Sequence, residues 1–117
     1  MTKTVEMCTA FLVVGLFLMV AFAATPAWAG ADEGKALYEK QCKTCHSIAG
    51  EGGKMAAMGG ALDGVGAKRD EAWLSAYLKD PKSKIENAKM PKLTLTDGQL
   101  ADVIAFLSTL KTPAPAK

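Results

Sequence analysis

The residue types best suited to chemistry gather in one five-residue segment, Cys42-Lys43-Thr44-Cys45-His46. Two thiols three positions apart, followed directly by an imidazole, form the Cys-x-x-Cys-His pattern, in which the thiols add to the vinyl groups of haem and the imidazole binds the iron. At the end of a helix, residues three and four apart have Cβ atoms about 5–6 Å apart, so all three side chains can face one flat macrocycle. The motif predicts one covalently attached haem c (iron), held through Cys42 and Cys45, with His46 as a metal ligand.

Two other uses of this motif are weaker. A disulfide or thioredoxin-like redox pair needs a strand-turn-helix context, and the sequence is poor in strand patterns. A zinc site needs four ligands, but the adjacent Cys45 and His46 are awkwardly placed to share one tetrahedral ion, and no second cysteine or histidine pair completes the set. Haem is favoured because the whole motif is far more specific than Cys-x-x-Cys alone.

The sixth iron ligand must be another residue type, because His46 is the only histidine. Methionine is the leading candidate, and Met90 lies in an irregular stretch where Pro91 restricts the backbone directly after the thioether. Met55 and Met58 compete, but they lie nearer to His46 in sequence, whereas the ligand must approach the opposite haem face. The ordinary alternative for any methionine is gap-filling in a core. We expect Met90 to be the ligand.

Residues 1–29 have the pattern of a cleavable secretory signal peptide. A short polar start precedes an apolar run over residues 10–24, and residues 27–29 (Ala-Trp-Ala) offer a small-residue cleavage site. An uncleaved anchor is the alternative, but the run is shorter than the roughly 20 residues that a spanning helix needs. Cleavage would start the mature chain at Gly30, remove Cys8, and leave a periplasmic or otherwise exported protein with no permanent membrane span.

Length and charge limit the remaining chain to one small domain. Removing 29 of the 117 residues leaves 88, a size at which an unaided apolar core gives only marginal stability. The formal net charge of +2 does not suggest a nucleic-acid binder. We expect one domain over residues 30–111, completed by the haem, and a disordered Pro/Ala tail over residues 112–117.

Three segments have a helical pattern and none has strand alternation, which predicts a small all-α domain. The first helix should begin near Asp32 and run into the cysteines. The second should be capped by Asp70 and end before Pro81, and the third should follow a capping box at residues 96–99 (Thr-Asp-Gly-Gln). Seven glycines within residues 47–67 predict a loop without regular elements, and the chain between the second and third helices should be irregular.

Residues 32–110 resemble a class I c-type cytochrome of the small soluble bacterial kind, with one haem. Tyr77, Pro81 and then Met90, nine residues after that proline, are similar to the family's tyrosine-to-methionine segment. The resemblance implies the small cytochrome c fold, with about three main helices and long loops around the haem, and a tyrosine hydroxyl able to hydrogen-bond the ligand sulfur. It also implies a single-electron carrier with His/Met ligation, not an enzyme, that serves redox protein partners outside the cytoplasm.

The resemblance extends to the first helix. Gly34 and Tyr38 match the family's glycine and aromatic residue, which pack across the last helix. We expect Leu100, Ile104 and Leu107 to be the opposite surface.

Three further positions follow the family less closely. The family often has a proline after the haem motif whose neighbouring carbonyl accepts the imidazole N–H, but this sequence has Gly59-Gly60, so the resemblance does not supply that bond. Lys68 or Arg69 would pair with a haem propionate or simply be solvated. Trp73 has no family counterpart, and we expect a core aromatic.

Two other functions stay open at this point. A haem enzyme such as a small peroxidase needs an open iron site and a distal acid-base group, which only Glu or Lys could supply here. A fixed cytochrome subunit of a larger oxidoreductase is not distinguished by the sequence. We name residues 79–92 the lysine segment, because its lysines outnumber its acidic residues: Lys79, Lys82, Lys84, Lys89 and Lys92 against Asp80 and Glu86. This surplus of positive charge indicates either a surface to which redox partners dock by charge or an ordinary solvated surface.

Overall fold

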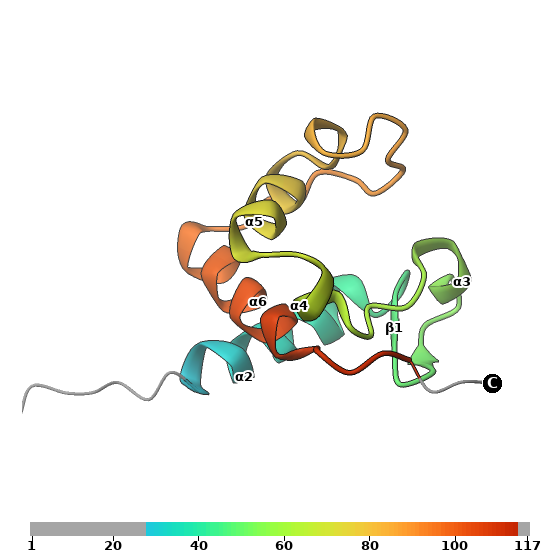
Figure 1. Cartoon of the computed structure of the whole chain (residues 1–117), viewed down its shortest axis with the longest axis horizontal. Coiled ribbons are helices and arrows are strands. Elements are labelled where there is room, and N and C mark those ends of the chain that lie inside the picture. Colours follow the sequence, from blue (N-terminus) through green and yellow to red (C-terminus); the bar gives the residue numbers. More distant parts are fainter. Residues whose placement is uncertain (1–27, 115–117) are drawn as a thin grey trace, which may run out of the picture.

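The computed structural model describes residues 28–114, and its regular elements are mostly helical (Figure 1). They are α2 (Trp28–Leu37), the π-helical turn η1 (Tyr38–Cys42), α3 (Ala56–Gly59), α4 (Val65–Lys68), α5 (Glu71–Lys79), the 3-10 turn η2 (Pro81–Ser83) and α6 (Asp97–Thr109). Strands β1 (Ser47–Ile48) and β2 (Glu51–Gly52) form an antiparallel hairpin. The predicted all-α fold is confirmed. Within residues 28–114, no helix combines the length and apolar character needed to cross a membrane.

Two predicted segments lie partly or wholly beyond this range. Most of the proposed signal peptide, residues 1–27, is outside the described residues, and so is the end of the proposed tail, residues 115–117. Residues 112–114 belong to no helix or strand.

The helices α5 and α6 begin and end where their local signals predict. Asp70 Oδ1 accepts a hydrogen bond from the Trp73 backbone N–H at 2.7 Å, and α5 stops before Asp80 and Pro81. At the start of α6, Thr96 Oγ1 accepts from the Gln99 N–H at 3.2 Å, and Gln99 Oε1 accepts from the Thr96 N–H at 3.0 Å. This reciprocal capping box satisfies two donors that the helix itself leaves unpaired.

The first helix already includes Trp28, the first residue that the structure describes, so Asp32 lies inside the helix and does not cap it as predicted. The cause is contact with α6. A Cβ added at Gly30 would lie 3.1 Å from Asp102 Oδ1, and one added at Gly34 would lie only 2.0 Å from the Asp102 carbonyl oxygen. Because residues four apart share a helix face, these two glycines let α2 lie against α6 over an additional turn.

The surface that receives the first helix also differs from the prediction. The atoms nearest to Gly34 belong to Asp102 and Phe106, and the Tyr38 ring packs on Phe106 with centroids 5.7 Å apart. The leucine face of α6 instead packs with α5 in one buried cluster: Leu74, Leu78, Leu100, Val103, Ile104 and Leu107. Figure 1 shows α6 between α2 and α5, so one face of α6 packs against α2 and another packs against α5.

The glycine-rich stretch is more ordered than predicted. It contains β1, β2, α3 and α4, none longer than four residues. Glycines with positive φ, at residues 50, 60 and 64, separate these elements by reversing the chain. Ala49 also has a positive φ of 53°, and Asp63 Oδ1 accepts a hydrogen bond from its N–H at 2.9 Å. The stretch therefore consists of short elements separated by glycines of positive φ.

Candidate functional site

A largely apolar cleft brings together most of the predicted site residues. Its empty space is about 750 Å³, a volume that includes the part open to solvent. The residues that line it are Cys42, His46, Gly59, Leu62, Val65, Arg69, Trp73, Leu74, Tyr77, Leu78, Ile85, Met90, Val103 and Leu107. Two predicted iron ligands and one predicted attachment thiol therefore share one apolar hollow.

The cysteine motif follows directly on the π-helical turn η1. The Lys43 N–H donates to the Tyr38 carbonyl at 2.9 Å, five residues back, which is the wider bonding pattern often found at functional sites. Beyond it, the N–H groups of Cys45 and His46 both donate to the Cys42 carbonyl, at 3.0 and 2.9 Å. The motif is thus a tight turn that presents Cys42 and His46 to the cleft, while Cys45 is half-buried and is not among the lining residues.

The environment of the two thiols argues against the redox-pair alternative. Cys42 and Cys45 are not joined by a disulfide. Burial, with a smaller contribution from Cys45, raises the pKa of the Cys42 thiol, whereas reactive redox cysteines need a lowered pKa. The zinc alternative also lacks support, because within residues 28–114 no three His, Cys, Asp or Glu side chains gather as a metal site.

The imidazole of His46 is oriented by a backbone carbonyl that the sequence did not identify. His46 Nδ1 lies 3.1 Å from the Gly60 carbonyl oxygen. Because a carbonyl can only accept, Nδ1 carries the proton and Nε2 keeps the lone pair that a metal needs. The family often places a proline segment here, and its carbonyl accepts the imidazole N–H. In this chain the Gly60 carbonyl is the acceptor.

The two glycines are suited to this task for different reasons. A Cβ at Gly59 would lie 1.9 Å from the Cys45 carbonyl oxygen, so only glycine permits this close approach. Gly60 has φ 78° and ψ 176°, a backbone conformation that is essentially restricted to glycine. On the other side of the motif, the Tyr38 hydroxyl donates to the His46 carbonyl at 3.3 Å. Tyr38 and the Gly59-Gly60 pair therefore both contact the cysteine motif, Tyr38 through the His46 carbonyl and Gly60 through the His46 imidazole.

Of the three methionines within residues 28–114, Met90 is the one that lines the cleft. Its side chain is half-buried and packs against the core cluster. Met55 and Met58 are 43% and 78% exposed, and neither lines the cleft. Figure 1 shows the orange loop before α6, the segment that includes residue 90, above β1 and α3 in the view.

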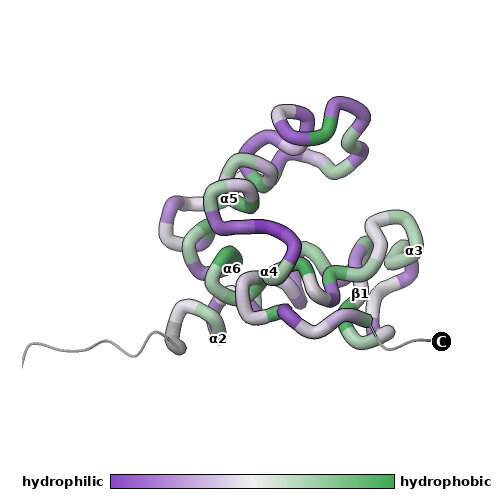
Figure 2. Tube along the Cα trace, in the orientation of Figure 1, coloured by the Kyte–Doolittle hydropathy of each residue, from purple (hydrophilic) through white to green (hydrophobic). Residues whose placement is uncertain are grey.

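The lysine segment forms the outer surface of that loop. Its five lysines are all exposed, and Figure 2 colours this region mostly hydrophilic. Lys92 Nζ lies 3.5 Å from Asp80 Oδ2, an ion pair that joins the two ends of the segment. Among the described residues no other ion pair forms, so the remaining lysines leave a surplus of positive charge beside Met90.

Helix α5 and Arg69, which precedes it, contribute a group of contacting side chains to the cleft wall. The rings of Trp73 and Tyr77 stack with centroids 4.9 Å apart and planes 12° from parallel. The Arg69 guanidinium carbon lies 4.3 Å from the centroid of the Trp73 ring. Trp73 does pack against the core as predicted, but it also lines the cleft, which the sequence did not reveal.

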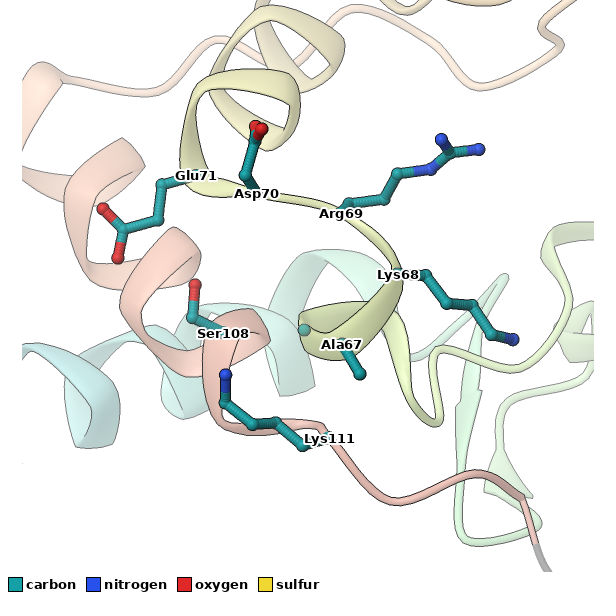
Figure 3. Close-up of a pocket in the computed structure, with 8 residues that line it drawn as sticks. Ala67, Lys68, Arg69, Asp70, Glu71, Ser108 and Lys111 are labelled. Carbon is teal, nitrogen blue, oxygen red and sulfur yellow. The ribbon is translucent and has the colours of Figure 1, made fainter.

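Of the two candidate propionate partners, only Arg69 reaches the cleft. Lys68 lines a separate surface hollow with Glu71 and Lys111, and it is absent from the cleft wall. Figure 3 shows Lys68 and Arg69 extended to one side of this hollow, with Glu71 and Lys111 extended to the other. Charges that diverge in this way do not form a binding site of their own.

The side chains present fit a haem. A thiol, an imidazole with a free Nε2 and a thioether are ligand types that haem proteins use, and the remaining wall is mostly aliphatic and aromatic. Asp and Glu carboxylates are absent from the lining, so a flat apolar macrocycle meets little polar surface there.

Comparison with known proteins identifies a family and several relatives. The family model described as Cytochrome c matches residues 31–111. Cytochrome c2 of Blastochloris viridis is 32% identical over 82% of this chain and 90% of the relative. Cytochrome c2 of Rhodospirillum rubrum is 29% identical over 86% of this chain and 97% of the relative, and cytochrome c of Tetrahymena pyriformis is 27% identical over 68% and 88%.

Proposed function

The chain belongs to the cytochrome c family of haem-bearing electron-transfer proteins, and we propose that it is an exported single-electron shuttle whose haem iron is held by His46 and Met90. As in the family, the haem c is covalently attached. We assign the two attachment bonds to Cys42 and Cys45. When bound, this group supplies a centre that gains or loses one electron.

The observation that carries this proposal is the shared cleft of His46 and Met90. The two side chains come from segments more than 40 residues apart, yet both line one apolar hollow. His46 has its Nδ1–H engaged by Gly60, so its Nε2 is available, and Met90 brings a thioether to the same cleft from the loop before α6. With both side chains bound, the iron would have no vacant position for oxygen or peroxide, which favours electron transfer over oxygen chemistry.

The protein side chains then have two tasks. The imidazole, the thioether and the apolar wall hold the site in one geometry and exclude water, so that little must rearrange when an electron arrives or leaves. A neutral thioether ligand favours the reduced, less positive state, which sets a comparatively positive potential.

Export and partner docking complete the proposal. The pattern of residues 1–29 supports secretion, and loss of Trp28 and Ala29 on cleavage would still leave Gly30 and Gly34, the residues of α2 that approach α6. The lysine segment beside Met90 suits redox partners with an acidic surface, because opposite charges guide such encounters.

An absorption spectrum of protein matured by its own secretion route tests the ligand set. We expect a reduced low-spin c-type spectrum and, in the oxidised protein, the long-wavelength band of iron–thioether ligation. A high-spin oxidised spectrum without that band would contradict the Met90 assignment. A size-exclusion profile of native extracts should place the protein as a free small carrier, and elution only within a large complex would contradict the shuttle.

A further inference from the structure

The Trp73 ring of α5 contacts both a guanidinium and a second aromatic ring. The Arg69 guanidinium carbon lies 4.3 Å from the Trp73 ring centroid, and the Tyr77 ring centroid lies 4.9 Å from it. Trp73 and Tyr77 are four residues apart on α5 and share a face of that helix. Arg69 lies in extended backbone before α5, and all three side chains line the cleft.

This arrangement restricts how Tyr77 can move. A near-parallel indole on one face of the phenol ring removes the freedom to swing toward that side. The indole is in turn contacted by a guanidinium, a planar group that stacks well on aromatic faces. Tyr77 and Met90 line the same cleft, so the orientation of the tyrosine bears on the environment of the methionine.

We propose that Trp73, which contacts Arg69, is a positioning residue that fixes the orientation of Tyr77 in the cleft wall. By holding Tyr77 it strengthens the binding of Met90 to the haem iron. This inference rests on the proposed His46 and Met90 ligation. It gives Trp73 a role beyond packing in the core, where it touches the buried cluster of α5 and α6.

The two roles of Trp73 differ in what they predict for variants. If Trp73 only packs in the core, its removal lowers the stability of the fold. The strength of the iron–thioether bond should then change no more than it does when an aromatic residue outside the cleft is removed. If Trp73 acts through Tyr77, its removal weakens the hold on Met90, and that effect disappears once Tyr77 has been removed. Non-additivity of this kind is what a double-mutant cycle measures.

The experiment uses the oxidised holoprotein and added imidazole, which competes with Met90 for the iron. Trp73→Leu should tighten imidazole binding about tenfold, the magnitude expected for loss of one aromatic stack. In a Tyr77→Leu background, the same change should alter imidazole binding less than about twofold. Trp73→Phe keeps a ring that can stack and should restore binding to within about threefold of the wild type. Arg69→Gln should tighten imidazole binding in the wild type but not in Trp73→Leu.

Phe106→Leu is the matched control, because this aromatic packs on Tyr38 and does not line the cleft. It should lower the urea midpoint and leave imidazole binding unchanged. Equal effects of Trp73→Leu in both Tyr77 backgrounds would overturn the inference, and so would a lowered urea midpoint with unchanged imidazole affinity. If the wild-type holoprotein lacks the thioether band, the ligation and this inference fail together, whereas a normal band with no coupling overturns this inference alone.

Discussion

Replacing Gly59 by alanine perturbs the most crowded point of the candidate site. The new Cβ would lie 1.9 Å from the Cys45 carbonyl oxygen and 2.9 Å from His46 Nδ1. The backbone at residue 59 must therefore retreat by about 1 Å to bring this contact to about 3 Å, the shortest that a Cβ tolerates, because a close-packed interior leaves no void to absorb the methyl group.

The cost follows from the two contacts that the retreat disturbs. If half of the movement reaches Gly60, the bond from His46 Nδ1, now 3.1 Å, lengthens to about 3.6 Å, which is no longer a hydrogen bond. Overpacking costs about 1–3 kcal/mol and a lost hydrogen bond about 0.5–1.5 kcal/mol, so the free energy of unfolding should fall by about 2–4 kcal/mol. With a urea dependence of about 2 kcal/mol per molar, the midpoint should fall by about 1–2 M.

The assay is urea unfolding of the holoprotein together with its reduction potential. The potential should rise, because an imidazole without its N–H···O=C bond is a weaker electron donor to iron. Gly98→Ala is the matched control: its Cβ would meet only Thr96 Oγ1, at 4.0 Å, so the variant should gain about 0.4–1 kcal/mol at unchanged potential. An unaltered midpoint and potential in Gly59→Ala would refute the reasoning that links this glycine to His46.

Three further predictions concern the haem and its surroundings. Met90→Ala should remove the long-wavelength thioether band, lower the potential and open the iron to added cyanide, while Met55→Ala and Met58→Ala leave the band in place; the reverse pattern would show that the ligand is misassigned. Intact mass of the natively matured protein should show one haem and no free thiol, since Cys42 and Cys45 are both consumed; a disulfide and no haem would contradict the attachment. Oxidation by anionic ferricyanide should slow as salt rises, because screening shortens attraction to the lysine segment to about 8 Å at physiological ionic strength, and a rate independent of salt would count against docking by charge.

The sequence predicted those features of the fold that depend on nearby residues. Asp70 and the Thr96 capping box set the starts of α5 and α6 through side chains that reach only three residues ahead. The start of α2 was wrong because it depends on Gly30 and Gly34 meeting α6, a contact across about 70 residues of sequence. Local propensity is a weak guide wherever tertiary contact of this kind decides the outcome.

The same distinction applies to the candidate site. Ligand side chains such as His46 and Met90 can be proposed from residue type and spacing, and the structure places both side chains in one cleft. The partner of His46 Nδ1 could not be proposed, because Gly60 contributes only a carbonyl, and every residue has one. A pair of adjacent glycines is the signal that was available, since it permits both a close approach and a left-handed turn.

The apolar side chains of α5 and α6 serve two surfaces at once. Leu74, Leu78, Val103 and Leu107 belong to the buried cluster and also line the cleft. Whatever occupies the cleft therefore completes the core of a domain too small to bury much apolar surface alone. Truncating one of these leucines would cost about 2–5 kcal/mol and disturb fold and site together. At Gly59, Met90 and Trp73 the effect on the site can be measured separately from stability, because the reduction potential, the thioether band and imidazole binding report on the site while the urea midpoint reports on the fold.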